Sequence, residues 1–208
     1  MALIDSLIEQ VDGALRTLSG VEPATRSNPG AAAEEVALSD SERDHAAGLM
    51  RVNHAGEVCA QALYEGQAAV ARDDQTRESL LAAAAEETDH LVWCAQRLEE
   101  LGSAPSKLNP LFYAASYAMG AVTGLLGDKV SLGFVEATED QVCKHLENHL
   151  EALPEADQRS RLIIEQMHLD EARHGEEAMA AGGVEFPEPV KQAMTAVSRV
   201  MTETTYRI

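Results

Sequence analysis

The sequence predicts an all-α protein: a four-helix bundle with an apolar accessory helix between its two halves and an amphipathic helix at the C-terminus. Apolar residues recur every three or four positions over long segments, which is typical of amphipathic helices, and no segment shows the alternation of a strand. Glutamate and histidine also recur in one pattern in both halves of the 208-residue chain, and its spacing suits two pairs of antiparallel helices.

Three segments are expected along the chain: an amphipathic helix at 1–18, a linker at 19–38 and the bundle domain at 39–208. Leucine, isoleucine and valine at helical spacing predict the first helix, and prolines, glycines and an alanine run predict the linker. Ser39 and Glu42 form a capping-box pattern that opens the bundle domain. Its four long helices are expected at about 39–72, 76–101, 129–150 and 155–181, and a last amphipathic helix follows Pro189.

The two halves of the bundle are joined by the segment 108–127, which contains no charged residue. Its length of 20 residues is enough to span a bilayer. Asn109 and Pro110 at its start and three glycines within it argue against a stable spanning helix. A re-entrant or interfacial helix is therefore the preferred interpretation, ahead of a buried core helix and of a true span.

The composition excludes some classes of partner. The chain has 35 acidic and 16 basic residues and a formal net charge of -19. Phosphate binding needs a basic surface, so nucleic acid is excluded as a partner, and a simple electrostatic anchor on anionic lipid is disfavoured. Three cysteines without C-x-x-C spacing indicate reduced thiols.

A lone glutamate followed at a fixed interval by Glu-x-x-His is the pattern that both halves share. Its members are Glu57, Glu87 and His90 in the first half and Glu139, Glu171 and His174 in the second, with intervals of 30 and 32 residues. Such an interval fits one helix, a turn and the antiparallel return. Four helices can then direct four carboxylates and two imidazoles at one cavity, so these six residues are the predicted ligands of two metal ions.

Glu-x-x-His alone is a weak signal, because the chain contains it four times. The two other copies are Glu42/His45 and Glu165/His168. The first copy has no helix upstream to supply a partner glutamate. The second begins six residues before Glu171, about 240° around the helix, so it faces away from the same cavity. Register therefore selects the site, although Glu136, one turn before Glu139, stays a rival ligand.

The chemistry of the six side chains favours metal over a solvated charged face. Buried glutamates without a cation would carry a heavy desolvation cost. Oxygen and nitrogen ligands without thiolate favour iron or manganese over zinc or copper. Two such ions held close together can share the electrons that activate O2. We therefore predict two ions of iron or manganese per chain and O2 chemistry.

Three further residues are predicted near the ligands, where they would support them: Asp170, His54 and His145. Asp170, like Glu86, directly precedes a glutamate of the pattern. An acid at this position could reach a histidine across the bundle and fix its tautomer. His54 lies one turn before Glu57, where hydrogen bonding to the site and plain packing are equally open. His145 is expected near the rim of the cavity.

The motifs resemble those of the demethoxyubiquinol hydroxylases of ubiquinone biosynthesis, a family of ferritin-like di-iron carboxylate proteins. The motifs are His54-Ala-Gly-Glu57, Glu87-x-x-His90, Val135-Glu-Ala-Thr-Glu139 and Asp170-Glu171-x-x-His174. The resemblance implies a ferritin-like four-helix bundle and two irons at the six residues, with Glu87 and Glu139 bridging them. It also implies that His145 helps to relay electrons or protons. Some members carry a tyrosine where this chain has Leu146, so no role of that tyrosine is carried over.

The resemblance also implies a reaction and partners. The reaction is O2-dependent hydroxylation of the ring of 2-polyprenyl-3-methyl-6-methoxy-1,4-benzoquinol (3-demethoxyubiquinol) to 3-demethylubiquinol. The expected partners are this quinol, O2, an electron donor and a membrane surface that the segment 108–127 faces. Assembly with further copies or with other ubiquinone-biosynthesis proteins is left open. Without a recognisable targeting segment, a bacterial protein peripheral on the cytoplasmic face of the cell membrane is expected.

Two other functions compete with this one. An iron-storage or ferroxidase protein of ferritin type uses similar ligands, but it assembles into a soluble shell and has no use for an uncharged insert. A non-catalytic scaffold that binds quinone or lipid would carry the same ligand set without consuming O2.

Overall fold

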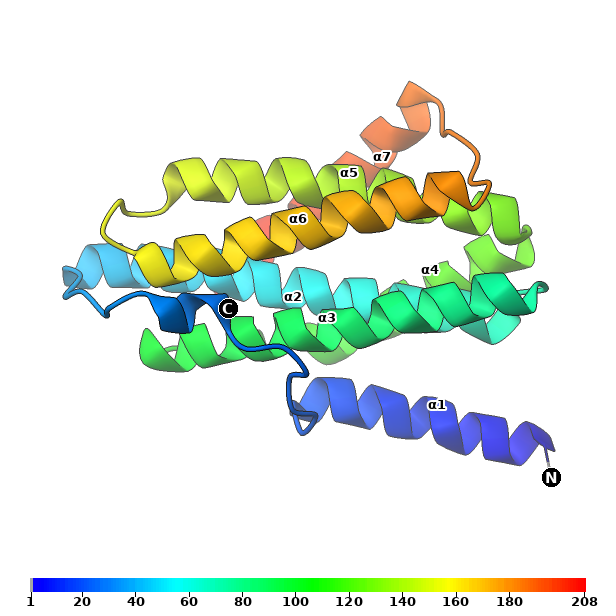
Figure 1. Ribbon diagram of the computed structural model, residues 1–208, viewed down its shortest axis with the longest axis horizontal. Helices are drawn as coiled ribbons and strands as arrows, with labels where there is room; N and C mark the ends of the chain where they lie inside the picture. Colours follow the sequence, from blue (N-terminus) through cyan, green and yellow to red (C-terminus); the bar gives the residue numbers. More distant parts are fainter. Residues whose placement is uncertain (1) are drawn as a thin grey trace.

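The computed structural model describes the backbone of residues 2–208 and the side chains of residue 8 and residues 10–208 (Figure 1). In this part of the chain all regular structure is helical. The elements are α1 (Ala2–Ser19), the 3-10 helix η1 (Pro29–Ala32), α2 (Asp40–Val70), α3 (Asp74–Glu100), α4 (Asn109–Leu125), α5 (Asp128–Ala152), α6 (Gln158–Ala180) and α7 (Glu188–Thr205). The predicted all-α, ferritin-like bundle is confirmed. Of the predicted N-terminal amphipathic helix, the side chains of residues 1–7 and 9 lie outside the described residues.

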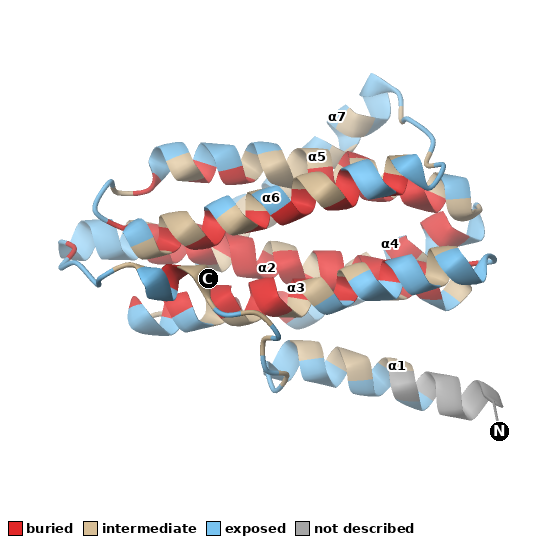
Figure 2. Ribbon diagram, in the orientation of Figure 1, coloured by how far each residue is buried: buried red, intermediate tan, exposed pale blue. Residues whose placement is uncertain are grey.

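The bundle consists of α2, α3, α5 and α6. A short turn joins α2 to α3 and another joins α5 to α6, so each pair is antiparallel. The two pairs lie one over the other, and their buried residues lie on the facing sides (Figures 1 and 2). Side chains from all four helices therefore meet in one interior.

Short-range hydrogen bonds set the ends of the helices. The predicted capping box is present, since the Ser39 backbone N–H donates to Glu42 Oε2 at 2.9 Å. The Asp73 side chain caps α3 by accepting the backbone N–H of Thr76 at 2.9 Å. Because this cap satisfies an amide of the first turn, α3 begins at Asp74, two residues before the predicted position.

Glycines allow α4 to pack closely along α2. A Cβ atom on Gly66 would lie 2.2 Å from the carbonyl oxygen of Tyr117, and one on Gly120 would lie 2.2 Å from that of Leu63. Only glycine permits this approach of two backbones. The glycines that would weaken a spanning helix therefore hold α4 against the bundle.

The outer face of α4 is apolar and exposed. Leu111, Val122 and Leu125 expose 65%, 55% and 62% of their surface. Among the described helices, none has both the length and the hydropathy that crossing a membrane requires. The interpretation of 108–127 as a plain core helix is wrong, because only one side of α4 is packed.

The linker is docked on the bundle. Gly30 in η1 is buried against α6, where a Cβ atom would lie 2.9 Å from the carbonyl oxygen of Arg159. The backbone N–H of Thr25 donates to Asp89 on α3 at 2.6 Å. These contacts bring the linker to the side of the bundle where α3 and α6 meet. The division of the chain into three units stays a prediction.

Candidate metal centre

The six predicted ligands meet in the interior of the bundle, where each is at most 4% exposed. Glu57 lies on α2, Glu87 and His90 on α3, Glu139 on α5, and Glu171 and His174 on α6. They form two groups whose ligand atoms all lie within 4.8 Å of one another: Glu57, Glu87, His90 and Glu171, and Glu87, Glu139, Glu171 and His174. The structure thus brings together every residue of the repeated pattern.

Two glutamates are common to both groups. Glu87 and Glu171 belong to both, whereas Glu57 and Glu139 each belong to one. The resemblance implies Glu87 and Glu139 as the bridging pair, whereas the pair common to both groups is Glu87 and Glu171. Which carboxylates bridge stays a prediction. Each Glu-x-x-His helix contributes one glutamate to the space between the histidines.

Both histidines present the same nitrogen to the carboxylates. His90 Nδ1 lies 2.9 Å from Glu87 Oε2, 3.0 Å from Glu171 Oε1 and 3.5 Å from Glu57 Oε2. His174 Nδ1 lies 3.3 Å from Glu171 Oε2 and 3.4 Å from Glu87 Oε1. Nδ1 is therefore the atom through which either imidazole would bind a metal, and Nε2 is left for other partners.

A carboxylate on the opposite helix lies next to each Nε2 atom. His90 Nε2 on α3 donates to Asp170 Oδ2 on α6 at 3.0 Å. His174 Nε2 on α6 lies 3.4 Å from Glu86 Oε2 on α3. Both acids precede a glutamate of the pattern, and each reaches the histidine across the bundle. A hydrogen-bonded partner fixes the tautomer of a metal-binding histidine and raises its basicity. His90 has this bond, whereas His174 Nε2 makes no hydrogen bond among the described residues.

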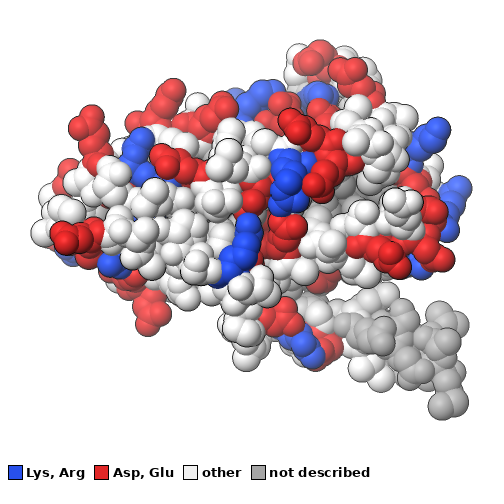
Figure 3. Space-filling view, viewed as in Figure 1, with Lys and Arg blue, Asp and Glu red and all other residues white. Residues whose placement is uncertain are grey.

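An arginine lies behind each of these carboxylates. Arg26 Nη1 donates to Asp170 Oδ2 at 2.8 Å, and Arg26 Nε donates to Asp89 Oδ2 at 2.6 Å. Arg173 donates a short hydrogen bond to Glu86 and lies 3.7 Å from Asp170 Oδ1. Figure 3 shows basic side chains among acidic ones in the middle of this face, over α3 and α6. Each histidine is thus connected to the surface by a carboxylate and an arginine.

The electrostatics of the cluster favour positive charge between the carboxylates. Burial raises the pKa of Glu57 and of Glu139 well above the usual glutamate range, and the carboxylates of Glu171 and Glu87 raise it further. Burial also acts to raise the pKa of Glu87, but the two histidines outweigh burial and lower it. Burial acts to lower the pKa of His174, but contacts with Glu171 and Glu87 raise it to about 11.

Orphaned oxygens show that the residues fit a metal. Glu87 Oε1 and Glu139 Oε2 are buried and have no hydrogen-bond partner among the described residues. A buried carboxylate oxygen without a partner is costly unless a cation coordinates it. Carboxylates with two imidazoles and no thiolate are the ligands that iron and manganese take. The cluster is therefore a candidate transition-metal centre.

Tyr64 and Arg26 contact this centre, and the sequence pattern identified neither. The Tyr64 hydroxyl donates a short hydrogen bond to Glu139 Oε1, and its ring centroid lies 6.2 Å from that of His174. Tyr64 lies seven residues after Glu57, on the same face of α2 two turns later, and this register was an available signal. Arg26 gave no such signal, because the linker has no helical period.

The other two supporting residues have partners elsewhere. His54 Nδ1 lies 3.2 Å from Asn109 Nδ2 on α4, and burial lowers the pKa of His54 to about 4. The ring centroid of His145 lies 3.9 Å from that of His149, one turn further along α5. No hydrogen bond in the described part of the chain joins His54 or His145 to the six clustered residues. Of the three residues predicted to support the ligands, only Asp170 makes such a hydrogen bond.

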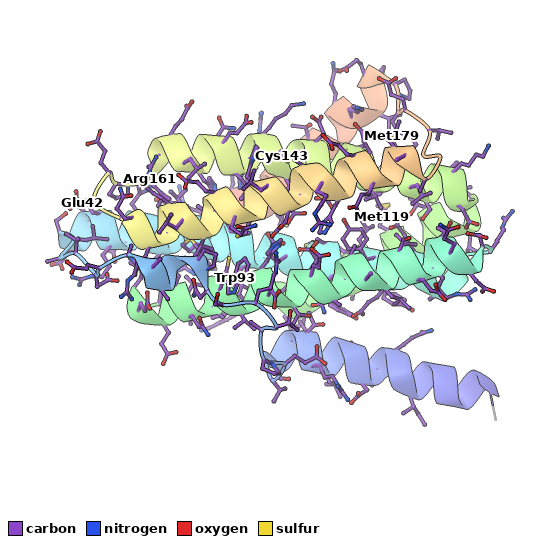
Figure 4. The ribbon with its side chains drawn as sticks, in the orientation of Figure 1. Glu42, Trp93, Met119, Cys143, Arg161 and Met179 are labelled. Carbon is purple, nitrogen blue, oxygen red and sulfur yellow. The ribbon has the colours of Figure 1, made fainter. Side chains whose placement is uncertain are left out.

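The two other Glu-x-x-His copies and the rival ligand Glu136 take no part in the cluster. Glu42 caps α2 at the far end of the bundle (Figure 4). His168 Nε2 pairs with Glu147 at 3.1 Å near the surface. Glu136, the rival ligand on α5, lies 3.4 Å from Lys191 of α7 and takes no part in either group.

The fold and the cluster define a ferritin-like helical bundle with a buried carboxylate–histidine site suited to transition metals. The model of the family described as "Ubiquinone biosynthesis protein COQ7" matches residues 44–205. The chain belongs to this family, which confirms the resemblance seen in its motifs.

Curated relatives match along the whole chain. The 3-demethoxyubiquinol 3-hydroxylase of Ectopseudomonas mendocina (strain ymp) is 58% identical over 99% of this chain and 96% of the relative. That of Ralstonia pickettii (strain 12J) is 57% identical over 99% of this chain and 100% of the relative. That of Marinomonas sp. (strain MWYL1) is 55% identical over 100% of both.

Proposed function

We propose that the chain catalyses O2-dependent hydroxylation of the ring of 3-demethoxyubiquinol to 3-demethylubiquinol, with two iron ions held by the six clustered residues. The observation that carries this proposal is the pair of buried groups that share Glu87 and Glu171 in a chain of the COQ7 family. Full-length relatives bear the name 3-demethoxyubiquinol 3-hydroxylase. A hydroxylating monooxygenase is the activity that fits both observations.

The protein contributes binding, orientation and exclusion of water. Iron held by these residues would supply the electrons that activate O2 for ring hydroxylation. Glu87 and Glu171 would hold both ions, and Glu57 and Glu139 would each hold one. Asp170 keeps the proton of His90 on Nε2, so Nδ1 is free to bind metal. Because all six residues are buried, bulk water is kept from the reacting atoms.

We propose further that the protein lies on the cytoplasmic face of a bacterial cell membrane as a peripheral protein. A polyprenyl quinol resides in lipid, and the exposed apolar face of α4 suits contact with it. Ile8 and Leu15 on α1 are each 61% exposed and add to this surface. An electron donor and assembly with further proteins belong to the same proposal. Recovery of the protein only in the soluble fraction of gently lysed cells would contradict it.

Complementation tests the activity and the site together. A bacterial strain that lacks its own hydroxylase and accumulates demethoxyubiquinone is expected to regain ubiquinone with the wild type and not with Glu171→Ala. Glu165→Ala is the matched control, because Glu165 lies on α6 but is exposed. Purified wild type and Glu165→Ala are expected to bind about two iron ions per chain.

Failure of the wild type to restore ubiquinone would contradict the proposed activity. Iron binding without restoration would favour the storage or scaffold function instead. The mass in solution separates these two, because a ferritin-type shell has many subunits.

A further inference from the structure

Two adjoining cavities lie between the end of α1, the linker and the α2–α3 pair. Their volumes are about 250 and 770 Å³. Both are lined by Arg16, Glu22, Gln61 and Thr88, so we treat them as one space, the linker cavity. Ligand sites usually have volumes of about 300–1,000 Å³, so the linker cavity has the size of a site for a small molecule.

The linker cavity lies against the helices that carry half of the metal centre. Gln61 follows Glu57 by one turn of α2, and side chains in this relation have Cβ atoms about 5–6 Å apart. Thr88 directly follows Glu87 on α3. Figure 1 shows the linker leaving the end of α1 and passing across α3. One wall of the cavity is therefore the same pair of helices that directs Glu57 and Glu87 into the bundle.

Gln61 gives this wall an unsatisfied hydrogen-bond acceptor. Its side chain is 6% exposed, and Nε2 donates to Thr88 Oγ1 at 3.3 Å. Gln61 Oε1 has no hydrogen-bond partner among the described residues. Because Gln61 also lines the cavity, this oxygen can accept a hydrogen bond from a ligand that donates one. Gln96 at the rim differs, because it is exposed and its Oε1 already accepts from Asn28 at 2.8 Å.

We infer that the linker cavity binds the ring of the reduced substrate and that Gln61 Oε1 accepts a hydrogen bond from a ring hydroxyl. This inference rests on the proposed function. A quinol has two O–H groups that donate, whereas the oxidised quinone has carbonyls that only accept. Gln61 therefore selects the reduced form, since a site built to pair a hydroxyl rejects the analogue that lacks it.

The larger part of the linker cavity suits the polyprenyl tail. Leu81, Ala84 and Ala85 of α3 line it together with Val21 and Pro23 of the linker. Leu81 is 49% exposed, so the apolar lining continues to the surface. When the ring is bound at Gln61, the polyprenyl tail can thus extend along this apolar lining toward the surface.

Binding of the two redox forms tests the inference directly. The probes are demethoxyubiquinol with a short prenyl tail and its oxidised quinone, added without O2 to the iron-loaded full-length protein. Quenching of Trp93 reports binding, because it is the single tryptophan and directly follows the cavity residue Val92. Wild type is expected to bind the quinol more tightly. Gln61→Leu is expected to weaken quinol binding about five- to tenfold and quinone binding less than about twofold.

The controls separate this role from general damage. Gln96→Leu is expected to keep the preference for the quinol. Gln61→Met replaces Gln61→Leu if the latter does not fold, as judged by iron content and thermal unfolding. Equal loss of both affinities, or no loss, overturns the inference. If the wild type restores ubiquinone while the Gln61 variants keep the preference, only the inference fails; if the wild type does not restore ubiquinone, the proposed function fails.

Discussion

The two halves of the metal centre are alike inside the bundle and differ outside it. Each half has a lone glutamate and a Glu-x-x-His pair, and an outer carboxylate from the other half contacts its histidine. In the first half the arginine behind that carboxylate is Arg26, which comes from the linker. In the second half it is Arg173, which lies on α6 beside His174. Only the first half therefore depends on a segment outside the four helices.

This difference shows where the N-terminal region acts. The backbone N–H groups of Thr25 and Arg26 donate to Asp89 at 2.6 and 3.3 Å, and the Arg26 guanidinium lies 4.9 Å from the centroid of the Trp93 ring. These contacts fix the linker beside Asp170 and so beside His90. The environment of His90 is thus coupled to the docking of the linker, whereas the contacts given above for His174 all come from the four helices of the bundle.

The largest expected effect distinguishes the glutamates common to both groups from the glutamates that belong to one group. Glu87→Ala removes a carboxylate common to both groups and is expected to reduce bound iron to well under about one ion per chain. Glu57→Ala and Glu139→Ala each weaken one group and are expected to keep about one ion. Iron content after desalting measures this, with Glu136→Ala as the control at about two. Equal loss in Glu57→Ala and Glu87→Ala would mean that the two groups do not bind separately.

The sequence predicted the helices and the clustering of the six ligands, because both follow from the helical periodicity of single segments. Register on α3 and α6 also placed Asp170 in reach of His90. The sharing of Glu171 was not predicted, because spacing along the chain does not tell which carboxylate lies between the histidines. That depends on how the two helix pairs are oriented across the bundle.

The contacts of Arg26 and Tyr64 could not be predicted from the sequence, for two different physical reasons. Arg26 lies in a segment without periodicity, and its bonds to Asp89 depend on how the linker docks over α3. Tyr64 is in register with Glu57, but its partner is Glu139 on the opposite pair of helices. A register on one helix indicates a face, and only the assembled bundle identifies the residue that the face meets.

A smaller effect is expected from the outer carboxylates. Substitution of such partners typically lowers metal affinity about 10–100-fold. For Asp170→Asn we expect a loss of iron affinity near the upper end of this range, because Asp170 bonds His90 at 3.0 Å and also accepts a hydrogen bond from Arg26. For Glu86→Gln we expect a loss of iron affinity near the lower end, because Glu86 lies farther from its histidine, at 3.4 Å from His174. Titration with ferrous iron against a competing chelator gives both values, and the opposite order would contradict the asymmetry of the two halves.

The arginines should give the smallest change in iron binding and the clearest difference between the halves. The side chains of Arg26 and Arg173 are 36% and 41% exposed, and ion pairs of this kind are worth about 0.2–1 kcal/mol. Iron affinity should therefore fall at most about fivefold in Arg26→Gln and in Arg173→Gln. Only Arg26→Gln should loosen the linker, so a protease that cleaves after glutamate should cut it faster at Glu22 and Glu34. Equal cleavage in both variants would show that η1, rather than Arg26, holds the linker on the bundle.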